Sequence, residues 1–507
     1  MSGALFWPPE GSAMYYPTLE QAQRLTAGGG FRRVPVSREI LSDFTSPVQT
    51  LRVLQNVGHH CFLLESAEDN QRWGRFTFLG FHPSLEVTCA NGLLRVRDVR
   101  STETRTESTT HPGAALRGIL SRHKSPGVPG LPPFTGGLVG YFSYDYVKYS
   151  EPSLSLDADD SEGFQDMDLM LFDKVIAFDN YRQRLILIAN ADTENLPESY
   201  AAACRELDEI AELLRHGAPK EYAPGKLRSP LRPLFDEAQY CRMVERGKAY
   251  IREGDIFQVV LSNRLEADFD GSLLDAYRVL RASNPSPYMF YFSSDDIEIA
   301  GASPETLVKL QDGVLRTFPL AGTRPRGATL KEDIQLERDL LSDEKELAEH
   351  NMLVDLGRND LGKISDFGTV EVENYLSVER FSHVMHIAST VRGRLRADRD
   401  AVDAVDAILP AGTLSGAPKL RAMEIINELE NNKRGLYGGA VGYLDFAGNL
   451  DVCIAIRLAF KKNGKVFVRS GAGIVADSVP EREYRECTQK ARAVVQALET
   501  AQGGELL

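Results

Sequence analysis

The best-spaced residues for chemistry lie near the C-terminal end of the chain. Glu483, Glu486 and Lys490 recur at steps of three and four, so they share one face of a predicted helix that Ser478-Val-Pro-Glu481 begins with a capping-box pattern. Two carboxylates beside an ammonium could hold a divalent cation and an anionic substrate. An ordinary solvated face with an i,i+4 ion pair fits the same spacing. The spacing therefore leaves both interpretations open.

A second acidic helix is predicted between Asp343 and residues 357–360. Glu346 and Glu349 are three residues apart and share a face of it. Mg²⁺ prefers one or two carboxylates together with waters and substrate oxygens, and one Glu from each helix would supply them. Acidic residues also favour helix starts because of the helix dipole, so the pattern alone is weak.

An arginine and a glycine-rich segment could bind an anion. Residues 450–460 alternate as a strand, with Arg457 among small neighbours on one face, where a guanidinium could hold a carboxylate or simply face solvent. Gly471-Ala472-Gly473 lies between a predicted strand and the last helix, and its N–H groups could approach a ligand or form a plain turn.

Loops with small hydroxyl residues surround Gly322-Thr323 and Thr413. Residues 357–363 match GxxxxGK, but Ile364 replaces the required Ser or Thr and a helix precedes them, so we do not predict nucleotide binding. His386 stands in an apolar run and could serve structure or acid–base chemistry near neutral pH.

Composition limits the class of protein. The chain has 507 residues, with 58 Lys and Arg against 72 Asp and Glu, a net charge of −14 that argues against nucleic-acid binding. It has 6 Cys without C-x-x-C spacing, no apolar run long enough for a membrane span, and no secretory signal pattern. We therefore expect a cytoplasmic protein that does not contact membranes.

The order of predicted elements suggests two parts. Strand-like and loop-like segments fill residues 31–193, helical periodicity covers residues 197–215, and breakers in residues 216–235 indicate a linker. A helix over residues 236–253 opens the second part, which ends as strand, turn, strand, turn and helix, with a hairpin at Asn463-Gly464.

Ten motifs in order resemble the large, chorismate-using subunit family of anthranilate synthase, component I, over residues 30–500. They are LLES (63–66), GRFTFLGFHP (74–83), NPSPYMFY (284–291), ASPETL (302–307), PLAGTRPRG (319–327), AEHNMLVDLGRNDLG (348–362), HVMH (383–386), GTLSGAPK (412–419), GLYGGAVGY (435–443) and GAGIVADSVPEREYRECTQKA (471–491).

The resemblance implies an α+β fold of antiparallel sheets stacked face to face with helices outside. It implies an N-terminal regulatory domain over residues 1–225 and a chorismate-binding catalytic domain over residues 226–507. It implies bound Mg²⁺ on Glu349 and Glu486. The residues it implies as chorismate contacts are Gly322, Thr323, Tyr437, Arg457, Gly471, Ala472, Gly473 and Lys490.

The family reaction adds ammonia to chorismate, expels the 4-hydroxyl and then eliminates pyruvate to give anthranilate, the first step of tryptophan biosynthesis. We assign Glu305 as a candidate general acid for the leaving hydroxyl, since expelling hydroxide at neutral pH needs protonation. We assign His386 to the elimination, as base or electrostatic partner, and the loop residue Thr413 to the same catalytic group.

Two residues argue against related enzymes on this fold. Gln258 stands where isochorismate and salicylate synthases carry a water-activating Lys, and Ala321 stands where aminodeoxychorismate synthases carry a Lys. Aminodeoxychorismate synthase component I is the alternative enzyme. The other alternative is a non-catalytic regulatory subunit that binds tryptophan and the amidotransferase. The residues that argue against it are the intact Glu349, Glu486, Arg457 and Lys490.

The resemblance also implies regulation and a partner. Ser66, Pro287, Tyr288 and Met289 match a tryptophan pocket, so feedback inhibition is expected. The chain shows no glutaminase motif, so a separate glutamine amidotransferase subunit, component II, is expected to supply ammonia, in a heterotetramer of two large and two small subunits.

Overall fold

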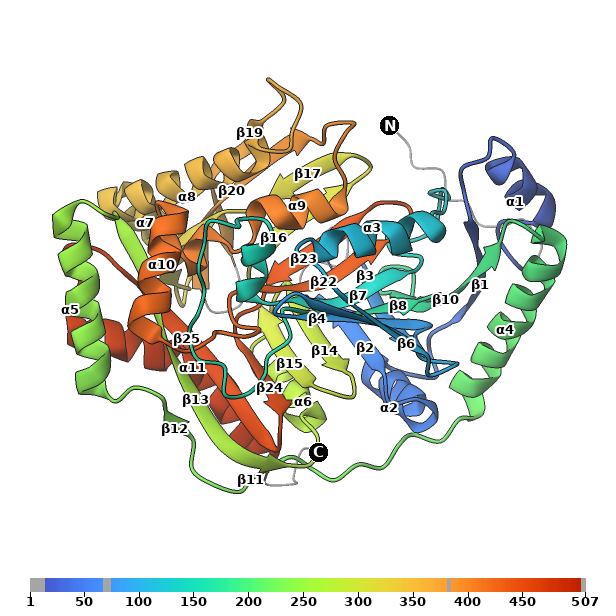
Figure 1. The fold of residues 1–507 in the computed structure, drawn as a ribbon, viewed down its shortest axis with the longest axis horizontal. Helices are drawn as coiled ribbons and strands as arrows, with labels where there is room; N and C mark the ends of the chain where they lie inside the picture. The colour runs from blue at the N-terminus through green and yellow to red at the C-terminus, as the bar shows by residue number, and fades with distance from the viewer. Residues whose placement is uncertain (1–13, 67–73, 381–383, 503–507) are drawn as a thin grey trace.

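Two antiparallel β-sheets stack face to face, and helices cover the outer face of each (Figure 1). The structure is a computed structural model that describes residues 14–66, 74–380 and 384–502. Buried side chains of both sheets, such as Phe62 and Phe172, meet in one core between them. The stacked α+β architecture predicted from the sequence is confirmed.

The first sheet contains 13 strands among the described residues. Its strands run in the spatial order β1 (Arg33–Leu41), β10 (Arg184–Asp192), β9 (Lys174–Asp179), β3 (Phe76–Phe81), β2 (Cys61–Glu65), β14 (Tyr288–Ser293), β15 (Glu298–Ser303), β24 (Leu458–Lys462), β25 (Lys465–Ile474), β13 (Gln258–Asp270) and β11 (Lys226–Leu227), with β12 (Arg232–Pro233) and β21 (Gly416–Ala417) also paired to β13.

The second sheet contains 12 strands of the described chain. Its strands run in the spatial order β18 (Leu320–Pro325), β20 (Val384–Arg394), β17 (Val314–Thr317), β16 (Thr306–Gln311), β23 (Leu450–Ile454), β22 (Ala440–Asp445), β7 (Gly137–Phe142), β8 (Met167–Phe172), β4 (Leu85–Ala90), β5 (Leu93–Asp98) and β6 (Thr104–Ser108), with β19 (Glu371–Arg380) also paired to β20.

The helices form the two outer layers. Those packed outside the first sheet include α1 (Leu19–Thr26), α2 (Pro47–Val57), α4 (Leu196–His216), α5 (Glu237–Glu253), α6 (Leu274–Ser283), α10 (Lys419–Glu430) and α11 (Pro480–Ala501). The others are α3 (Pro112–Arg122), α7 (Leu330–Ser342), α8 (Glu344–Gly362) and α9 (Ala401–Ile408), with the 3₁₀ turns η1 (Tyr144–Tyr149) and η2 (Gly412–Leu414). In Figure 1, α3, α8 and α9 lie along the upper side and α2, α6 and α11 along the lower side.

Strands from both halves of the sequence share each sheet. In the first sheet β2 pairs with β14, and in the second β7 pairs with β22. The backbone hydrogen bonds of both pairs therefore cross the predicted boundary at residue 225. The functional division at that residue stays a prediction.

The predicted strand over residues 450–460 is wrong in one respect, because the chain breaks it at Arg457. β23 ends at Ile454 in the second sheet, and β24 starts at Leu458 in the first. Arg457 takes the left-handed conformation at φ +51°, which is uncommon for a residue with a side chain. The chain thus crosses between the sheets at the one residue singled out there for binding an anion.

Two further expectations need correction. Residues 471–473 are not a turn but part of β25, because their backbone continues the ladder with β13. The capping box at Ser478 does not form: Val479 is the N-cap of α11, and the Ser478 hydroxyl instead accepts a hydrogen bond from the Val475 N–H.

Other local predictions are confirmed. α5 begins after Asp236 with a complete capping box, and α4 covers the predicted helical segment. Asn463 and Gly464 both have positive φ in the tight turn that joins β24 to β25, as an Asn-Gly hairpin requires. Within the described part of the chain, no helix has the length and apolar character needed to cross a membrane.

Candidate active site

A buried carboxyl group forms the first part of the candidate site. Glu305 follows β15 and accepts a hydrogen bond from the Thr413 hydroxyl of η2 at 3.0 Å. Burial raises the pKa of Glu305 to about 7, although Thr413, Lys490 and Arg457 each lower it. A carboxyl group with this pKa carries its proton in a large share of molecules at neutral pH, as a general acid must.

An oriented histidine forms the second part. β18 and β20 pair with a bulge at Gly322, which has φ +66°, and this pairing sets Thr323 opposite His386. His386 Nδ1 lies 2.9 Å from the Gly322 carbonyl oxygen and 3.1 Å from the Thr323 hydroxyl. A carbonyl only accepts, so Nδ1 carries the proton and the basic lone pair is on Nε2. Burial lowers the pKa of His386, which favours the neutral form.

The carboxylates predicted to bind a metal, on α8 and α11, lie close enough for their charges to interact. Burial raises the pKa of Glu349, and the negative charges of Glu346 and Glu486 raise it further. Glu486 pairs with Lys490 at 2.8 Å on the face predicted from their spacing. Glu346 reaches the Gly322 bulge, since a Cβ at Gly322 would lie 3.2 Å from its Oε2. The acidic group and the histidine therefore belong to one site.

Arg457, which the sequence predicts to bind an anion, lies within electrostatic range of Glu305 and His386. The surrounding protein desolvates Arg457 and lowers its pKa, while Glu305 raises it, yet the residue keeps solvent access. Glu349 combines desolvation and solvent access in the same way. Both residues are therefore reached by solvent although protein surrounds much of each side chain.

The strand segment at residues 471–473 has one open edge. β24 pairs with β25 only as far as Val468, whereas β13 continues beside residues 469–474. Alternate N–H groups of an antiparallel strand point to opposite sides, so beyond Val468 every second N–H points away from β13. A Cβ at Gly471 would lie 2.9 Å from the Tyr437 hydroxyl, and one at Gly473 would lie 2.6 Å from Gln258 Nε2. The glycines thus leave room for these polar side chains.

The donor groups on α8 and α11 have the chemistry that a magnesium ion requires. They are carboxylate oxygens from Glu349 and Glu486, with Glu346 beside them, and Mg²⁺ prefers such hard oxygen ligands with part of its shell left to water or substrate. Burial is the main reason why the pKa of Glu349 is raised, and repulsion by Glu346 and Glu486 adds to it; a bound cation would relieve that repulsion.

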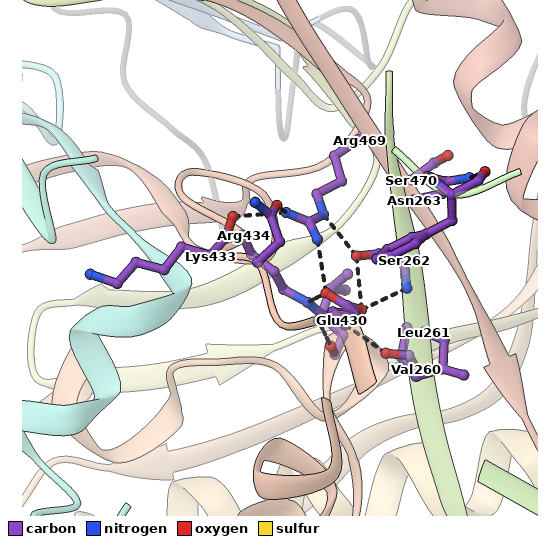
Figure 2. A network of polar contacts seen from close by, with 12 residues as sticks. Val260, Leu261, Ser262, Asn263, Glu430, Lys433, Arg434, Arg469 and Ser470 are labelled. Atoms are coloured by element: carbon purple, nitrogen blue, oxygen red, sulfur yellow. Dashed lines mark hydrogen bonds and ion pairs between the residues drawn. The ribbon is translucent and has the colours of Figure 1, made fainter. Parts of the chain in front are cut away.

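A buried polar network supports the site from behind (Figure 2). Glu430 at the end of α10 binds Arg434 at 2.5 Å and Arg469 of β25 at 2.9 Å, and it accepts from the Ser262 N–H of β13 at 2.7 Å. Arg434 also donates to the carbonyl of Leu414, the residue after Thr413. The network therefore joins η2, β13 and β25, which carry the residues around Glu305 and residues 471–473.

The four residues predicted to bind an effector line one cavity of about 280 Å³ between the sheets. The lining comprises Leu64, Glu65, Ser66, Arg75, Phe76, Phe78, Pro133, Pro287, Tyr288, Met289, Phe290, Lys309, Gln311, Val441, Gly442, Tyr443, Asp451 and Cys453. Tyr288 donates to Asp451 at 2.8 Å, and Lys309 pairs with Asp451 at 3.0 Å. Asp451 and Cys453 were not assigned to this pocket from the sequence. The alternation of residues 450–454 places Asp451 and Cys453 on one face of a strand, and this was the available signal.

The structure thus brings the predicted site residues into two groups. Glu305 contacts Thr413, His386 contacts Thr323 and Gly322, and Glu349 lies within electrostatic range of Glu486 and Lys490. Ser66 and residues 287–289 line the separate cavity. Of the HVMH motif, His383 lies outside the described residues.

Comparisons with known proteins agree on one family. Residues 59–496 match the family model described as chorismate binding enzyme. Anthranilate synthase component 1 of Acetivibrio thermocellus is 43% identical over 96% of this chain and 99% of its own length. The crystal structure of anthranilate synthase component I from Streptococcus pneumoniae TIGR4 aligns with a TM-score of 0.73 at 40% identity, covering 83% of this chain and 92% of that one. MenF, the menaquinone-specific isochorismate synthase of Escherichia coli, shares the fold with a TM-score of 0.66 at 21% identity, covering 95% and 98%.

Proposed function

Because this chain belongs to the anthranilate synthase component I family of chorismate-binding enzymes, we propose that it aminates chorismate with ammonia and eliminates pyruvate to give anthranilate. The observation that carries the proposal is the protonatable Glu305, held by Thr413 and flanked electrostatically by Arg457 and Lys490. Glu305 can supply a proton, and the two cations Arg457 and Lys490 suit chorismate, which is a dianion.

Each residue of the site has a distinct task. Arg457 and the open N–H groups of residues 471–473 bind a substrate carboxylate. Glu305 donates its proton to the departing hydroxyl oxygen, so the C–O bond breaks with loss of water rather than hydroxide. The neutral His386 accepts a proton at Nε2 during the elimination, because its Nδ1–H is committed to the Gly322 carbonyl. Thr413 orients the Glu305 carboxyl group.

Magnesium is the proposed cofactor, held by Glu349 and Glu486. When bound there, it supplies positive charge that neutralises a substrate carboxylate and fixes its orientation. Lys490, paired with Glu486 at 2.8 Å, adds a second cation at the same face of α11.

One assay tests the activity. The purified chain is mixed with chorismate, Mg²⁺ and an ammonium salt, and anthranilate is followed by fluorescence. Anthranilate together with an equal amount of pyruvate supports the proposal. An aminated product that retains the enolpyruvyl group would identify aminodeoxychorismate synthase instead, which Ala321 in β18 disfavours because alanine offers no nucleophile. No turnover would leave only a regulatory role.

The metal ligands give a first prediction. Glu349→Gln should raise the Mg²⁺ concentration needed for half-maximal rate by roughly tenfold or more, because an amide oxygen is a weaker, uncharged ligand. Glu486→Gln should do the same, whereas Glu481→Gln on an exposed part of the first turn of α11 should not. Activity is titrated against Mg²⁺ at fixed chorismate. An unchanged Mg²⁺ dependence in both variants would remove these residues from the metal site.

A glutamine amidotransferase, component II, is the proposed partner and source of ammonia. The proposal predicts that this chain uses ammonium salts alone and gains glutamine-dependent activity only when that subunit is added. A heterotetramer of two large and two small subunits and a cytoplasmic location stay predictions.

We also propose that tryptophan inhibits the enzyme by binding the cavity between the sheets. Its volume of about 280 Å³ is close to the lower end of the roughly 300–1,000 Å³ range of small-molecule sites. Aromatic side chains and a few polar groups line it, as an aromatic amino acid would require. No inhibition up to millimolar tryptophan would contradict this regulation.

The cavity gives a second prediction. Ser66→Phe should raise the tryptophan concentration for half-inhibition by about tenfold or more, because the ring would occupy space that the ligand needs. Ser66→Ala, which adds no bulk, is the matched control and should change it by much less. Rates without tryptophan, measured in the same series, report whether either substitution damages the enzyme. Equal inhibition of Ser66→Phe and the parent would place the effector elsewhere.

A further inference from the structure

A second cavity, of about 620 Å³, lies between helices α2 and α6 on the outer side of the first sheet. In Figure 1 both helices lie at the lower side of the molecule. The cavity is lined by Ser46, Val48, Gln49, Arg52, Arg278, Val279, Arg281, Ala282 and Ser283. None of these residues belongs to the candidate active site or to the effector cavity.

The lining of this α2–α6 cavity carries three guanidinium groups and no carboxylate. That is unusual for a chain with a net charge of −14. Arg278 pairs with Asp275 at 2.9 Å and Arg281 with Glu65 at 2.6 Å, but both carboxylates lie outside the lining. The local potential in the cavity is therefore positive, which favours an anion.

Arg52 is the least compensated of the three arginines. Its guanidinium lies 5.7 Å from the centre of the Tyr222 ring, and one nitrogen is 3.4 Å from the Lys220 carbonyl oxygen. Its Nε is buried without a hydrogen-bond partner, and no ion pair joins it to a carboxylate in the described ranges. The positive charge of Arg52 therefore has no carboxylate partner among the described residues, and an anion in the cavity would supply one; because Nε is closed off from solvent, such an anion would bind the terminal guanidinium nitrogens.

The remaining lining residues fit an organic anion. Ser46, Gln49 and Ser283 offer neutral polar groups, whereas Val48, Val279 and Ala282 offer apolar surface. Arginine guanidinium groups match the two oxygens of a phosphate or carboxylate by paired hydrogen bonds. We propose that the α2–α6 cavity is a binding site for a small molecule bearing phosphate or carboxylate groups, held by Arg52, Arg278 and Arg281.

This site would be separate from the effector cavity, although the two meet at one ion pair. Glu65 lines the effector cavity, and its partner Arg281 lines the α2–α6 cavity. Binding here is independent of chorismate turnover, so the test below does not depend on the proposed function.

Calorimetry with inorganic pyrophosphate and, separately, citrate tests the site and distinguishes phosphate from carboxylate ligands. Sodium chloride keeps the ionic strength constant, because screening would otherwise mimic competition. We expect at least one probe to bind the parent chain with a dissociation constant of about 1 mM or tighter. Arg52→Gln should weaken this binding at least roughly tenfold, because it removes the positive charge and the paired N–H donors of the guanidinium group.

A second pair of variants avoids dependence on the Arg52 packing. Ala282 is exposed and lines the cavity, so Ala282→Glu adds a negative charge there, whereas Ala282→Gln adds the same bulk without charge. Ala282→Glu should weaken binding at least about tenfold by repulsion and by pairing with Arg278 one turn earlier. Ala282→Gln should bind as the parent does within about threefold, and so should Arg242→Gln, a control on the exposed surface of α5.

Either of two results would overturn the proposal. The first is that neither probe binds the parent up to about 10 mM. The second is that Arg52→Gln and Ala282→Glu bind as tightly as the parent and Arg242→Gln, which would mean an adventitious ion only.

Discussion

Glu305→Gln is expected to lower the rate of anthranilate formation by about 10²–10⁴-fold, the usual contribution of a general acid. The amide keeps the size of the side chain and can still accept a hydrogen bond from Thr413, so the geometry at η2 should survive. What the variant lacks is the proton for the departing hydroxyl oxygen. The loss should therefore fall on kcat more than on KM.

The pH profile distinguishes this role from a merely structural one. Burial raises the pKa of Glu305 to about 7, and the acid must be protonated to act, so activity should fall as pH rises through about 7. Bound chorismate and Mg²⁺ would move the apparent value, so kcat/KM, which reports the free enzyme, is the quantity to follow. Because free ammonia increases with pH, each rate is divided by the free-ammonia concentration.

The matched variant is Thr413→Val, which removes the hydrogen bond to Glu305 but leaves the carboxyl group. The hydrogen bond from Thr413 lowers the pKa of Glu305. In Thr413→Val the decrease of kcat/KM with rising pH should therefore occur at higher pH. In Glu305→Gln this decrease of kcat/KM with pH should be absent. A Glu305→Gln rate within about threefold of the parent, with this decrease unchanged, would remove Glu305 from the chemistry.

The sequence predicts those parts of the site that depend on local spacing. Glu486 and Lys490 lie one turn apart on a helix, so their pairing follows from helix geometry alone. The Asn463-Gly464 hairpin and the cap at Asp236 follow equally from local backbone preferences. The stacking of two sheets came from the resemblance and not from these local patterns.

Other parts depend on contacts that no local pattern encodes. Residues 450–460 alternate like one strand, yet the chain changes sheets at Arg457, because the apolar faces before and after it pack into different layers. Residues 471–473 look like a turn because glycine breaks most strands, but here the partner strand β13 continues the ladder past them. Both exceptions lie at the candidate site. Functional sites are where secondary structure most often departs from local sequence preference, because the backbone must approach a ligand closely.

The sequence gives no indication that Glu430 contributes strongly to the stability of the fold. With Arg434 four residues later it looks like an ordinary surface ion pair at the end of a helix. In the structure Glu430 is 2% exposed and joins two buried guanidinium groups, Arg434 and Arg469 (Figure 2). Burial raises the pKa of Glu430, but the two arginines outweigh burial and hold it below its ordinary value, so the group is ionised at neutral pH.

Glu430→Gln should therefore lower the free energy of unfolding by about 3–5 kcal/mol, because it leaves two cations buried without their counter-ion. Glu428→Gln is the matched control two residues earlier: its carboxylate is about half exposed and 3.8 Å from Arg246, so we expect a loss of at most about 1 kcal/mol. Urea unfolding of both variants at neutral pH measures the difference.

The pH dependence gives this prediction a sign. A carboxylate whose pKa is lowered by folding stabilises the fold above its unfolded pKa, and this contribution disappears as pH falls through the folded value. The gap between the parent and Glu430→Gln should thus be widest at neutral pH and narrow under acid. A constant gap, or one below about 1 kcal/mol at neutral pH, would show that the buried ion pairs contribute no net stability. Since Arg434 also binds the carbonyl after Thr413, and Arg469 precedes residues 470–473 in β25, a loosened network would disturb the acid and the anion-binding edge together.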